Sequence, residues 1–301
     1  MSWQSQVIKI YFRTQRFFSP LRDELDVSKE RADLEAFAKT FKPLGKVDIT
    51  RTDAGGMPGA WIIPLGLETR RTILYLHGGS YNAGSINSHL PLTSNIALAA
   101  KARVLAIDYR LAPEHPFPAA VDDALAAYQW LLKESVQASQ IAVAGDSAGG
   151  GLTLSLLLYL HQLGLPQPAA AVCLSPWTDL TCSGESWTTN ARSDFMLKRA
   201  PGLESAQIYA GGADLRAPLV SPLFADPAGL PPLLIQVGSD ETLLSDSTLF
   251  AEKARAAGVD VTLDVWKGMQ HVWQYAASML PEGRQAIERI GEFIIRHCPE
   301  G

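Results

Sequence analysis

From residue 72 onward, the chain alternates short hydrophobic runs with longer amphipathic stretches. The short runs have the length of β-strands, and several carry almost no polar residue, which is typical of parallel strands buried on both faces. They are Thr72–Leu76, Arg103–Asp108, Gln140–Gly145, Ala170–Ser175, Leu233–Gly238 and Val261–Trp266. Helical patterns separate them, at Leu90–Ala100, Ala119–Lys133, Ala148–Gln162, Ser245–Ala257 and Glu282–His297. This alternation predicts an α/β protein with a doubly wound, mostly parallel sheet flanked by helices.

Two further strand patterns, Lys46–Thr50 and Ala60–Pro64, flank a segment rich in glycine and proline at 53–59. Because such residues favour turns, we expect a hairpin that precedes the parallel strands. Before the hairpin we expect a helix that begins after Ser28, whose side chain would cap the first turn.

The connection from Pro176 to Pro232 is too long for a simple loop of a compact domain, and such segments usually have structure or a function of their own. Together with the N-terminal stretch, it would cover the carboxyl ends of the strands, where open α/β sheets bind ligands. We therefore predict a catalytic domain at 46–301 and a helical cap formed by 1–45 and 176–225.

The composition excludes several classes of partner. The 301 residues include 26 Lys and Arg and 31 Asp and Glu, which gives a net charge of −5. We expect no nucleic-acid partner, because phosphate binding needs clustered basic residues. The three cysteines, Cys173, Cys182 and Cys298, form no CxxC pair. This argues against a disulfide framework and a thiolate zinc site, and it favours a reducing, cytoplasmic location.

No segment has the pattern of a membrane span. The longest apolar run, Leu152–Leu160, is interrupted by polar residues and is far shorter than the roughly 20 residues that a bilayer requires. Residues 1–18 mix basic and aromatic side chains and lack the features of a signal peptide. A helix there could touch a membrane surface, but docking on the body of the protein is favoured, so we expect no stable membrane insertion.

The most specific local pattern is Gly145–Gly151, which reads GDSAGGG. A bare G-x-S-x-G match is weak in a chain with 24 glycines, and a phosphate-binding loop or a plain turn are the alternatives. The predicted strand before it and the predicted helix after it favour a nucleophile elbow, whose glycines permit a sharp turn that presents the Ser147 hydroxyl.

A second pattern, His77–Tyr81, directly follows a predicted strand. Small residues there let backbone N–H groups approach a substrate, and such groups stabilise the oxyanion of acyl transfer by a few kcal/mol. His77 could act as a base, but its position before the glycines favours a role in bracing the loop.

A serine nucleophile needs a base, and the base needs a carboxylate that orients it. Of the six histidines, we select His271, which follows the end of the last predicted strand. Asp240 follows the strand before that one, and the order Ser147, Asp240, His271 is expected for this fold. Glu241 and Asp246 are rival acids. We prefer Asp240, because Glu241 should point away from it and Asp246 should belong to the next helix.

Five stretches, in this order, carry motifs of a known family. They are His77–Tyr81 (HGGSY), Asp108–Ala120 (DYRLAPEHPFPAA), Gly145–Gly150 (GDSAGG), Ser239–Asp240 followed by Leu243, and Gly268–His271 (GMQH). Together they resemble the hormone-sensitive-lipase-like, bacterial family IV carboxylesterases of the α/β-hydrolase superfamily. The resemblance implies an α/β-hydrolase fold with a cap built from N-terminal helices and an insertion.

Carried over to matching positions, the resemblance implies Ser147 as the nucleophile, His271 as general base and then acid, and Asp240 as its orienting partner. His77 and Asp146 belong to the same motifs and are expected to support the site. No metal and no organic cofactor are implied.

The resemblance also implies an oxyanion hole in the loop Gly78–Ser80 and at Ala148, with the N–H groups of Gly79, Ser80 and Ala148 as donors. Ser80 departs from the family, which usually has a third glycine there. If this position needs a positive φ, serine costs roughly 1–2 kcal/mol.

These features predict a serine carboxylesterase that hydrolyses short- to medium-chain esters of small molecules through an acyl-enzyme. An amidase, a lactonase or an aryl-formamide hydrolase would use the same triad, and fold alone does not separate them. A non-catalytic small-molecule receptor and an interfacial lipase are more remote alternatives. The resemblance allows a homodimer.

Overall fold

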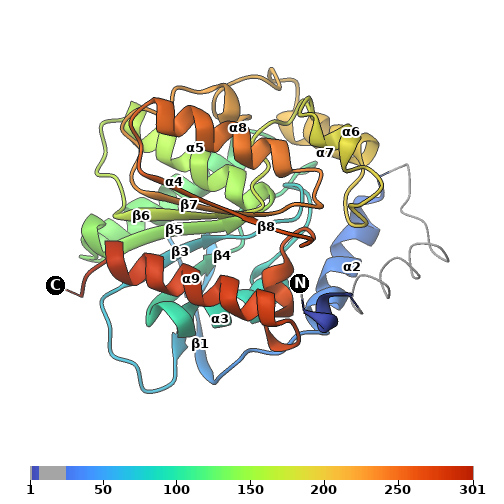
Figure 1. The fold of residues 1–301 in the computed structure, drawn as a ribbon. Coiled ribbons are helices and arrows are strands. Elements are labelled where there is room, and N and C mark those ends of the chain that lie inside the picture. Colours follow the sequence, from blue (N-terminus) through green and yellow to red (C-terminus); the bar gives the residue numbers. More distant parts are fainter. Residues whose placement is uncertain (1, 7–24, 301) are drawn as a thin grey trace.

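The computed structural model describes residues 2–6 and 25–300, and within them the chain forms one eight-stranded sheet between two layers of helices (Figure 1). The strands are β1 (Val47–Asp53), β2 (Pro58–Pro64), β3 (Thr72–Leu76), β4 (Arg103–Ile107), β5 (Ile141–Asp146), β6 (Ala170–Leu174), β7 (Leu233–Gly238) and β8 (Val261–Trp266). They are arranged in the order β1-β2-β4-β3-β5-β6-β7-β8. Strands β3 to β8 are parallel, so the predicted mostly parallel sheet is confirmed.

The predicted leading hairpin is also present. Strand β1 pairs antiparallel with β2, with Val47 opposite Pro64, and β2 pairs antiparallel with β4. Both strands extend beyond the predicted bounds, because the turn occupies only residues 54–57.

Helices α3 and α9 cover one face of the sheet, and α4, α5 and α8 cover the other (Figure 1). The helices are α2 (Val27–Ala38), α3 (Ile86–Ala100), α4 (Ala119–Lys133), α5 (Ala148–Gln162), α6 (Ser186–Thr189), α7 (Arg199–Ala210), α8 (Leu244–Ala256) and α9 (Pro281–His297), with short 3₁₀ helices at η1 (Ala138–Gln140), η2 (Pro222–Phe224) and η3 (Trp273–Ser278). This arrangement buries both faces of the central strands, which explains why their sequences are hydrophobic without alternation.

Alternate residues of each central strand contribute to separate cores. In β3, Ile73 and Tyr75 pack with α3 and α9, whereas Leu74 and Leu76 pack with α4 and α5. Successive side chains of a strand point to opposite faces, so all five residues of β3 are buried. The site is thereby carried by strands whose positions are fixed from both sides.

The N-cap of α2 differs from the prediction. Its N-cap is Asp26, whose carboxylate accepts a hydrogen bond from the Lys29 N–H at 3.0 Å, and Ser28 lies inside the first turn. The prediction of Ser28 is wrong because Asp26, two residues earlier, is an equally good cap and satisfies a free N–H of the first turn.

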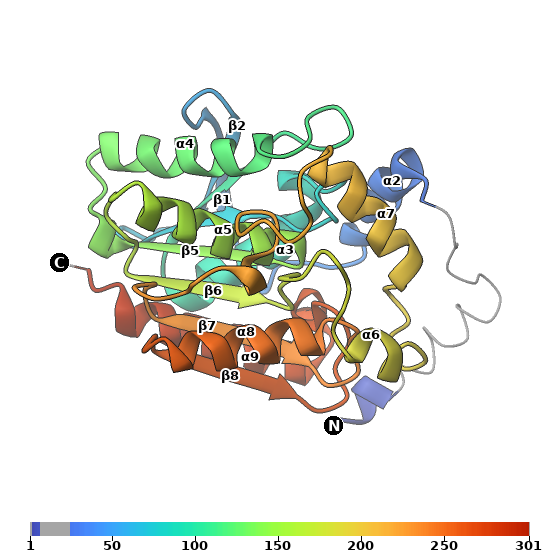
Figure 2. The same cartoon turned by 90° about the horizontal axis from the view of Figure 1, so that it is seen from above.

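Helices α2, α6 and α7 gather at the end of the sheet toward which the parallel strands run (Figure 2). The connection between β6 and β7 supplies α6 and α7. Its first residues are tied to α8, because the N–H groups of Thr178 and Asp179 donate to Asp246 at 2.9 and 2.8 Å. Asp246 is therefore a structural anchor in α8, in agreement with its assignment to a helix.

The three cysteines are buried and unpaired. The described residues contain no group of three or more His, Cys, Asp or Glu side chains arranged to hold a metal ion. Among the helices in the described ranges, none combines the length and the apolar character needed to cross a bilayer.

Candidate active site

Ser147 lies at the sharp turn between β5 and α5, where its backbone has φ 54° and ψ −121°. Its N–H donates to the Leu174 carbonyl at 2.8 Å, and its carbonyl accepts from the Trp177 N–H at 2.9 Å. A non-glycine residue in this conformation is strained, and the neighbouring backbone holds it in place. The geometry is that of the predicted nucleophile elbow.

The glycines around Ser147 are required by close packing of the backbone. A Cβ atom at Gly149 would lie 2.0 Å from the Leu76 carbonyl oxygen, and one at Gly145 would lie 2.3 Å from the Gly149 carbonyl oxygen. No side chain fits at such distances. The first turn of α5 is therefore pressed directly against the end of β3.

His271 lies in the loop after β8, and its Nδ1 donates a hydrogen bond to Glu241 Oε2 at 3.0 Å. The other carboxylate oxygen of Glu241 accepts from the Ser175 hydroxyl at 2.8 Å and from the Gly238 N–H at 2.5 Å. The Ser175 hydroxyl also accepts from the Val272 N–H at 3.3 Å. Ser175 thus connects the acid to the loop that carries the histidine.

Asp240, the acid expected from the sequence, does not meet His271. Its carboxylate accepts from the Ser239 hydroxyl at 3.0 Å and is partly exposed, whereas Glu241 is fully buried. Neighbouring residues do point in opposite directions here, but the turn after β7 directs Glu241 inward. The sequence does indicate a carboxylate partner for His271, because two adjacent acidic residues, Asp240 and Glu241, follow the strand. Which of the two reaches the histidine depends on the direction of the turn.

The charges around His271 favour its protonated form. Burial lowers the pKa of His271, but the hydrogen bond and the charge of Glu241 outweigh burial, so that the pKa is raised. Asp146, the residue before Ser147, is close enough to add to this effect. Burial raises the pKa of Glu241, and the hydrogen bond from His271 opposes this. The pair therefore stabilises an imidazolium, which a general base becomes during catalysis.

The loop after β3 presents backbone N–H groups beside Ser147. Gly79 has φ 118° and Ser80 has φ 55°, so the strain expected for a serine at this position applies. Among the described residues, no hydrogen bond uses the N–H groups of Gly79, Ser80 or Ala148. These three donors are therefore available to an oxyanion.

Gly78 does not fit the oxyanion hole in which the sequence places it. Its N–H points to Asp146 Oδ1 and to His89 Nε2, each at 3.1 Å. Because the N–H is used inside the protein, Gly78 anchors the loop and leaves oxyanion binding to its neighbours.

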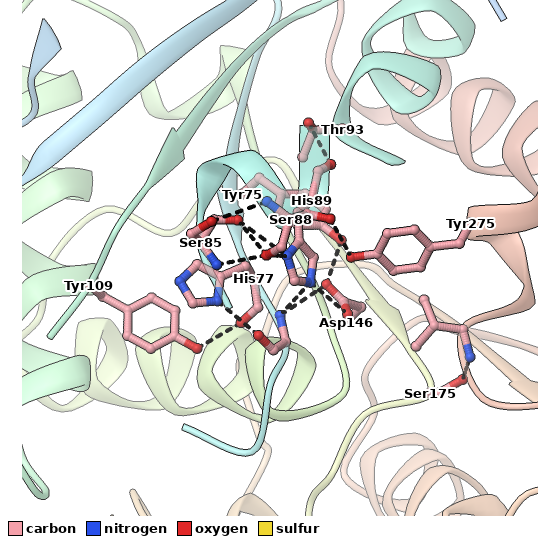
Figure 3. A network of polar contacts seen from close by, with 12 residues as sticks. Tyr75, His77, Ser85, Ser88, His89, Thr93, Tyr109, Asp146, Ser175 and Tyr275 are labelled. Carbon is pink, nitrogen blue, oxygen red and sulfur yellow. Dashed lines mark hydrogen bonds and ion pairs between the residues drawn. The ribbon is translucent and has the colours of Figure 1, made fainter. Parts of the chain in front are cut away.

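A buried polar network braces this loop (Figure 3). Asp146 accepts from the Tyr75 hydroxyl at 2.7 Å and lies 3.3 Å from His89 Nε2. Burial acts to raise the pKa of Asp146, but His89 and Tyr75 outweigh it and the pKa is lowered. The ionised Asp146, which directly precedes the nucleophile, accepts the hydrogen bond of the Gly78 N–H and so anchors the loop.

His77 takes the bracing role and not that of a base. Its Nδ1–H donates to the Gly78 carbonyl at 2.8 Å, and its ring stacks on Tyr109 with centroids 4.2 Å apart. Burial lowers the pKa of His77 to about 3, and the nearby His89 adds to the effect. A histidine with such a pKa is a poor acceptor of the serine proton at neutral pH.

A cavity of about 640 Å³ opens beside Ser147. The helices at the carboxyl end of the sheet, the oxyanion loop and the β6–β7 connection contribute its walls. Trp177, Trp187, Leu197 and Leu243 form apolar parts of the lining, and Glu30 and Ser80 are polar parts. The size is that of pockets for small organic molecules.

Comparisons with known proteins agree with this geometry. A model of the α/β hydrolase fold matches residues 73–275. An acetyl-hydrolase from Streptomyces hygroscopicus is 46% identical over 275 residues, which cover 91% of this chain and 90% of that protein. An esterase from Acinetobacter venetianus is 37% identical over 265 residues, 87% of each chain. The crystal structure of an esterase from the bacterial hormone-sensitive lipase family has a TM-score of 0.93 at 45% identity and 99% coverage of both chains.

The fold and the elbow define an α/β hydrolase, and the matches place it among enzymes that hydrolyse esters. The chain belongs to the hormone-sensitive-lipase-like esterases of the α/β-hydrolase superfamily. The resemblance inferred from its motifs is thereby confirmed.

Proposed function

We propose that the protein hydrolyses short- to medium-chain acyl esters through an acyl-enzyme formed on Ser147, with His271 as the base and Glu241 as its orienting acid. The hydrogen bond from His271 Nδ1 to the buried Glu241 carboxylate, 3.0 Å long, carries this proposal. It leaves Nε2 of the imidazole as the atom that accepts the serine proton.

In the first step, Ser147 Oγ attacks the ester carbonyl carbon while its proton passes to His271 Nε2. The carbonyl oxygen becomes an oxyanion, for which the free N–H groups of Gly79, Ser80 and Ala148 are the proposed donors. The proton then passes from Nε2 to the leaving alkoxide as the C–O bond breaks. A water molecule repeats the sequence on the acyl-enzyme and releases the acid.

We further propose that α2, α6 and α7 form the cap that limits the substrate. The cavity of about 640 Å³ and its apolar walls suit a short or medium acyl chain. The tryptophans Trp177 and Trp187 would contact the hydrocarbon part of the substrate, because burial of apolar surface is the main source of affinity in such pockets.

A panel of p-nitrophenyl esters with acyl chains of two to twelve carbons, together with matched amides and lactones, tests this proposal. We expect the highest kcat/KM for esters of eight carbons or fewer. Equal or faster turnover of the amides or lactones would contradict the assignment. A fluorophosphonate should label the wild type but not Ser147→Ala, and absence of labelling would instead indicate a receptor.

A further inference from the structure

The cavity beside Ser147 contains a carboxyl group that the proposed mechanism does not use. Glu30, in the first turn of α2, lines this cavity together with Ser80 of the oxyanion loop. The Ser80 side chain is close enough to Glu30 to lower the pKa of its carboxyl, against the larger opposite effect of burial. Glu30 and Ser80 are thus two polar groups from different segments in the lining of one cavity.

The position of Glu30 is fixed by contacts on both sides of it in α2. The next residue, Arg31, donates to the Asn82 carbonyl at 2.7 Å and to the Ala112 carbonyl at 3.1 Å, and forms an ion pair with Glu114 at 2.7 Å. One turn later, Glu35 accepts a hydrogen bond from the Ser85 hydroxyl. Helix α2 is therefore held against the segment that follows the oxyanion loop.

The Glu30 carboxyl is incompletely satisfied. Its Oε2 is buried and has no hydrogen-bond partner among the described residues. A buried acceptor without a donor is costly, and the cost disappears when a bound molecule supplies the donor. Burial also raises the pKa of Glu30 to about 7, against the opposing effect of the nearby Ser80 side chain.

The other charged groups at this cavity do not satisfy Glu30. Asp33 and Asp26 share its helix, and the negative charge of Asp33 adds to the rise in its pKa. Lys29 forms an ion pair with Asp33. Lys198, the residue directly before α7, also lines the cavity. The carboxyl of Glu30 thus keeps an unpaired acceptor in the wall of the cavity.

We infer that Glu30, together with Ser80, selects esters that carry a hydroxyl or amino group within reach of the scissile carbonyl. The inference rests on the proposed function, because it takes this cavity as the substrate site. A site built to hydrogen-bond a substrate OH or NH discriminates against an analogue that lacks it, since the protein group is then left unpaired. The donor lies near the carbonyl because Ser80 belongs to the same loop as the oxyanion donors.

Two pairs of nearly isosteric esters test the inference. Ethyl 3-hydroxybutyrate is compared with ethyl 3-methylbutyrate for the acyl side, and 2-hydroxyethyl butyrate with propyl butyrate for the alcohol side. For the wild type we expect kcat/KM of the hydroxylated ester to exceed that of its partner at least fivefold in one pair. A ratio below fivefold in both pairs would overturn the inference.

Three variants identify the group responsible. Glu30→Met should bring the ratio below fivefold, whereas Asp48→Asn, at an exposed carboxylate of β1 outside the cavity, should leave it unchanged. Glu30→Gln keeps an acceptor and should keep the preference, but should remove its change with pH around 7. The ratio is a suitable measure because titration of His271 affects both esters of a pair equally. A preference that survives Glu30→Met, or that Asp48→Asn also abolishes, excludes Glu30. If the Met variant does not fold, the pH dependence in Glu30→Gln decides.

Calorimetric binding of the four esters to Ser147→Ala separates this inference from the proposed function. Preferential binding of a hydroxylated ester that Glu30→Met removes would support the subsite even if the wild type hydrolysed none of them. Equal binding within each pair, alongside turnover by the wild type, would refute the subsite alone.

Discussion

At the level of single residues, the carboxylate of Glu241 is held from three sides. It is fully buried and accepts hydrogen bonds from His271, Ser175 and Gly238. A buried carboxylate is tolerated only when such donors compensate for its lost hydration. In return, its charge keeps the imidazole oriented and raises the pKa of His271.

Replacing this charge gives the first prediction. Glu241→Gln should lower kcat by about 10²–10⁴-fold, because the amide no longer stabilises the imidazolium. The pKa of His271 should fall, so the acidic limb of the pH–kcat/KM profile should move to lower pH. Asp240→Asn is the matched control and should keep activity within a few fold of the wild type. The reverse result, with Asp240 essential and Glu241 dispensable, would restore the acid expected from the sequence.

Glu30 affects stability as well as the cavity. Its pKa is about 7 in the folded protein against 4.5 ordinarily, so the folded state binds this proton more tightly than the unfolded state. The free energy of unfolding should therefore fall as pH rises from 4.5 to about 7, and this loss should be complete above 7.

Glu30→Gln should remove that dependence. We expect it to gain about 1–3 kcal/mol relative to the wild type between pH 4 and pH 8, measured from denaturant midpoints. Asp33→Asn, which changes an exposed carboxylate in an ion pair, should show no comparable gain. An identical pH profile for wild type and Glu30→Gln would mean that the carboxyl is solvated.

At the level of elements, the first turn of α5 depends on contact between backbones. Gly149→Ala would place a Cβ 2.0 Å from the Leu76 carbonyl oxygen, and it should destabilise the protein by more than about 4 kcal/mol or prevent folding. Gly258→Ala is the control, because that glycine has φ +85° but nothing within 4 Å of the added Cβ. It should cost only about 1 kcal/mol. Thermal unfolding of both variants compares the two effects, and equal losses would contradict the role of close packing.

The elements themselves could be predicted closely from the sequence. Strands β3, β7 and β8 and helices α4 and α5 have the predicted bounds, because buried strands are continuous apolar runs and helices keep a different period. The N-cap at Asp26 and the hydrogen bond between Glu241 and His271 were missed for a common reason. In each case two suitable residues lie close together in the chain, and only the path of the turn decides which one faces the partner group.

Some residues of the site could also be predicted from the sequence, and others could not. Ser147 and the oxyanion loop follow from motifs in which glycine spacing reflects a backbone requirement. The positioning role of Ser175 and the place of Glu30 in the cavity could not be predicted, because they depend on contacts between segments more than 50 residues apart in sequence.

At the level of the whole molecule, Arg71 joins the C-terminal end to the sheet. It is buried and donates to the carbonyl of Cys298 at 2.7 Å and to those of Ala100 and Lys101 at 3.1 Å. It also pairs with Glu300 at 3.2 Å. One side chain thereby connects the ends of α3 and α9 to the start of β3.

Arg71→Met should lower the free energy of unfolding by about 2–4 kcal/mol, because two buried carbonyl groups and a partly buried one lose their donor. The kcat of the folded enzyme should not change, since Arg71 lies at the end of the sheet opposite Ser147. Arg70→Met, at an exposed neighbour, should change stability by less than about 0.5 kcal/mol. A large loss of kcat in Arg71→Met without loss of stability would show that the two ends of the sheet are coupled.

The reactivity of the three buried thiols can be used to measure local unfolding. Cys173 lies in β6, Cys182 in the β6–β7 connection and Cys298 after α9. Burial raises the pKa of each thiol, that of Cys298 to about 12, and only a thiolate reacts quickly with an alkylating reagent. Each cysteine should be modified only when its own part of the fold opens. Mass spectrometry of the three alkylated peptides over time would therefore give separate opening rates for the sheet, the connection and the C-terminal helix.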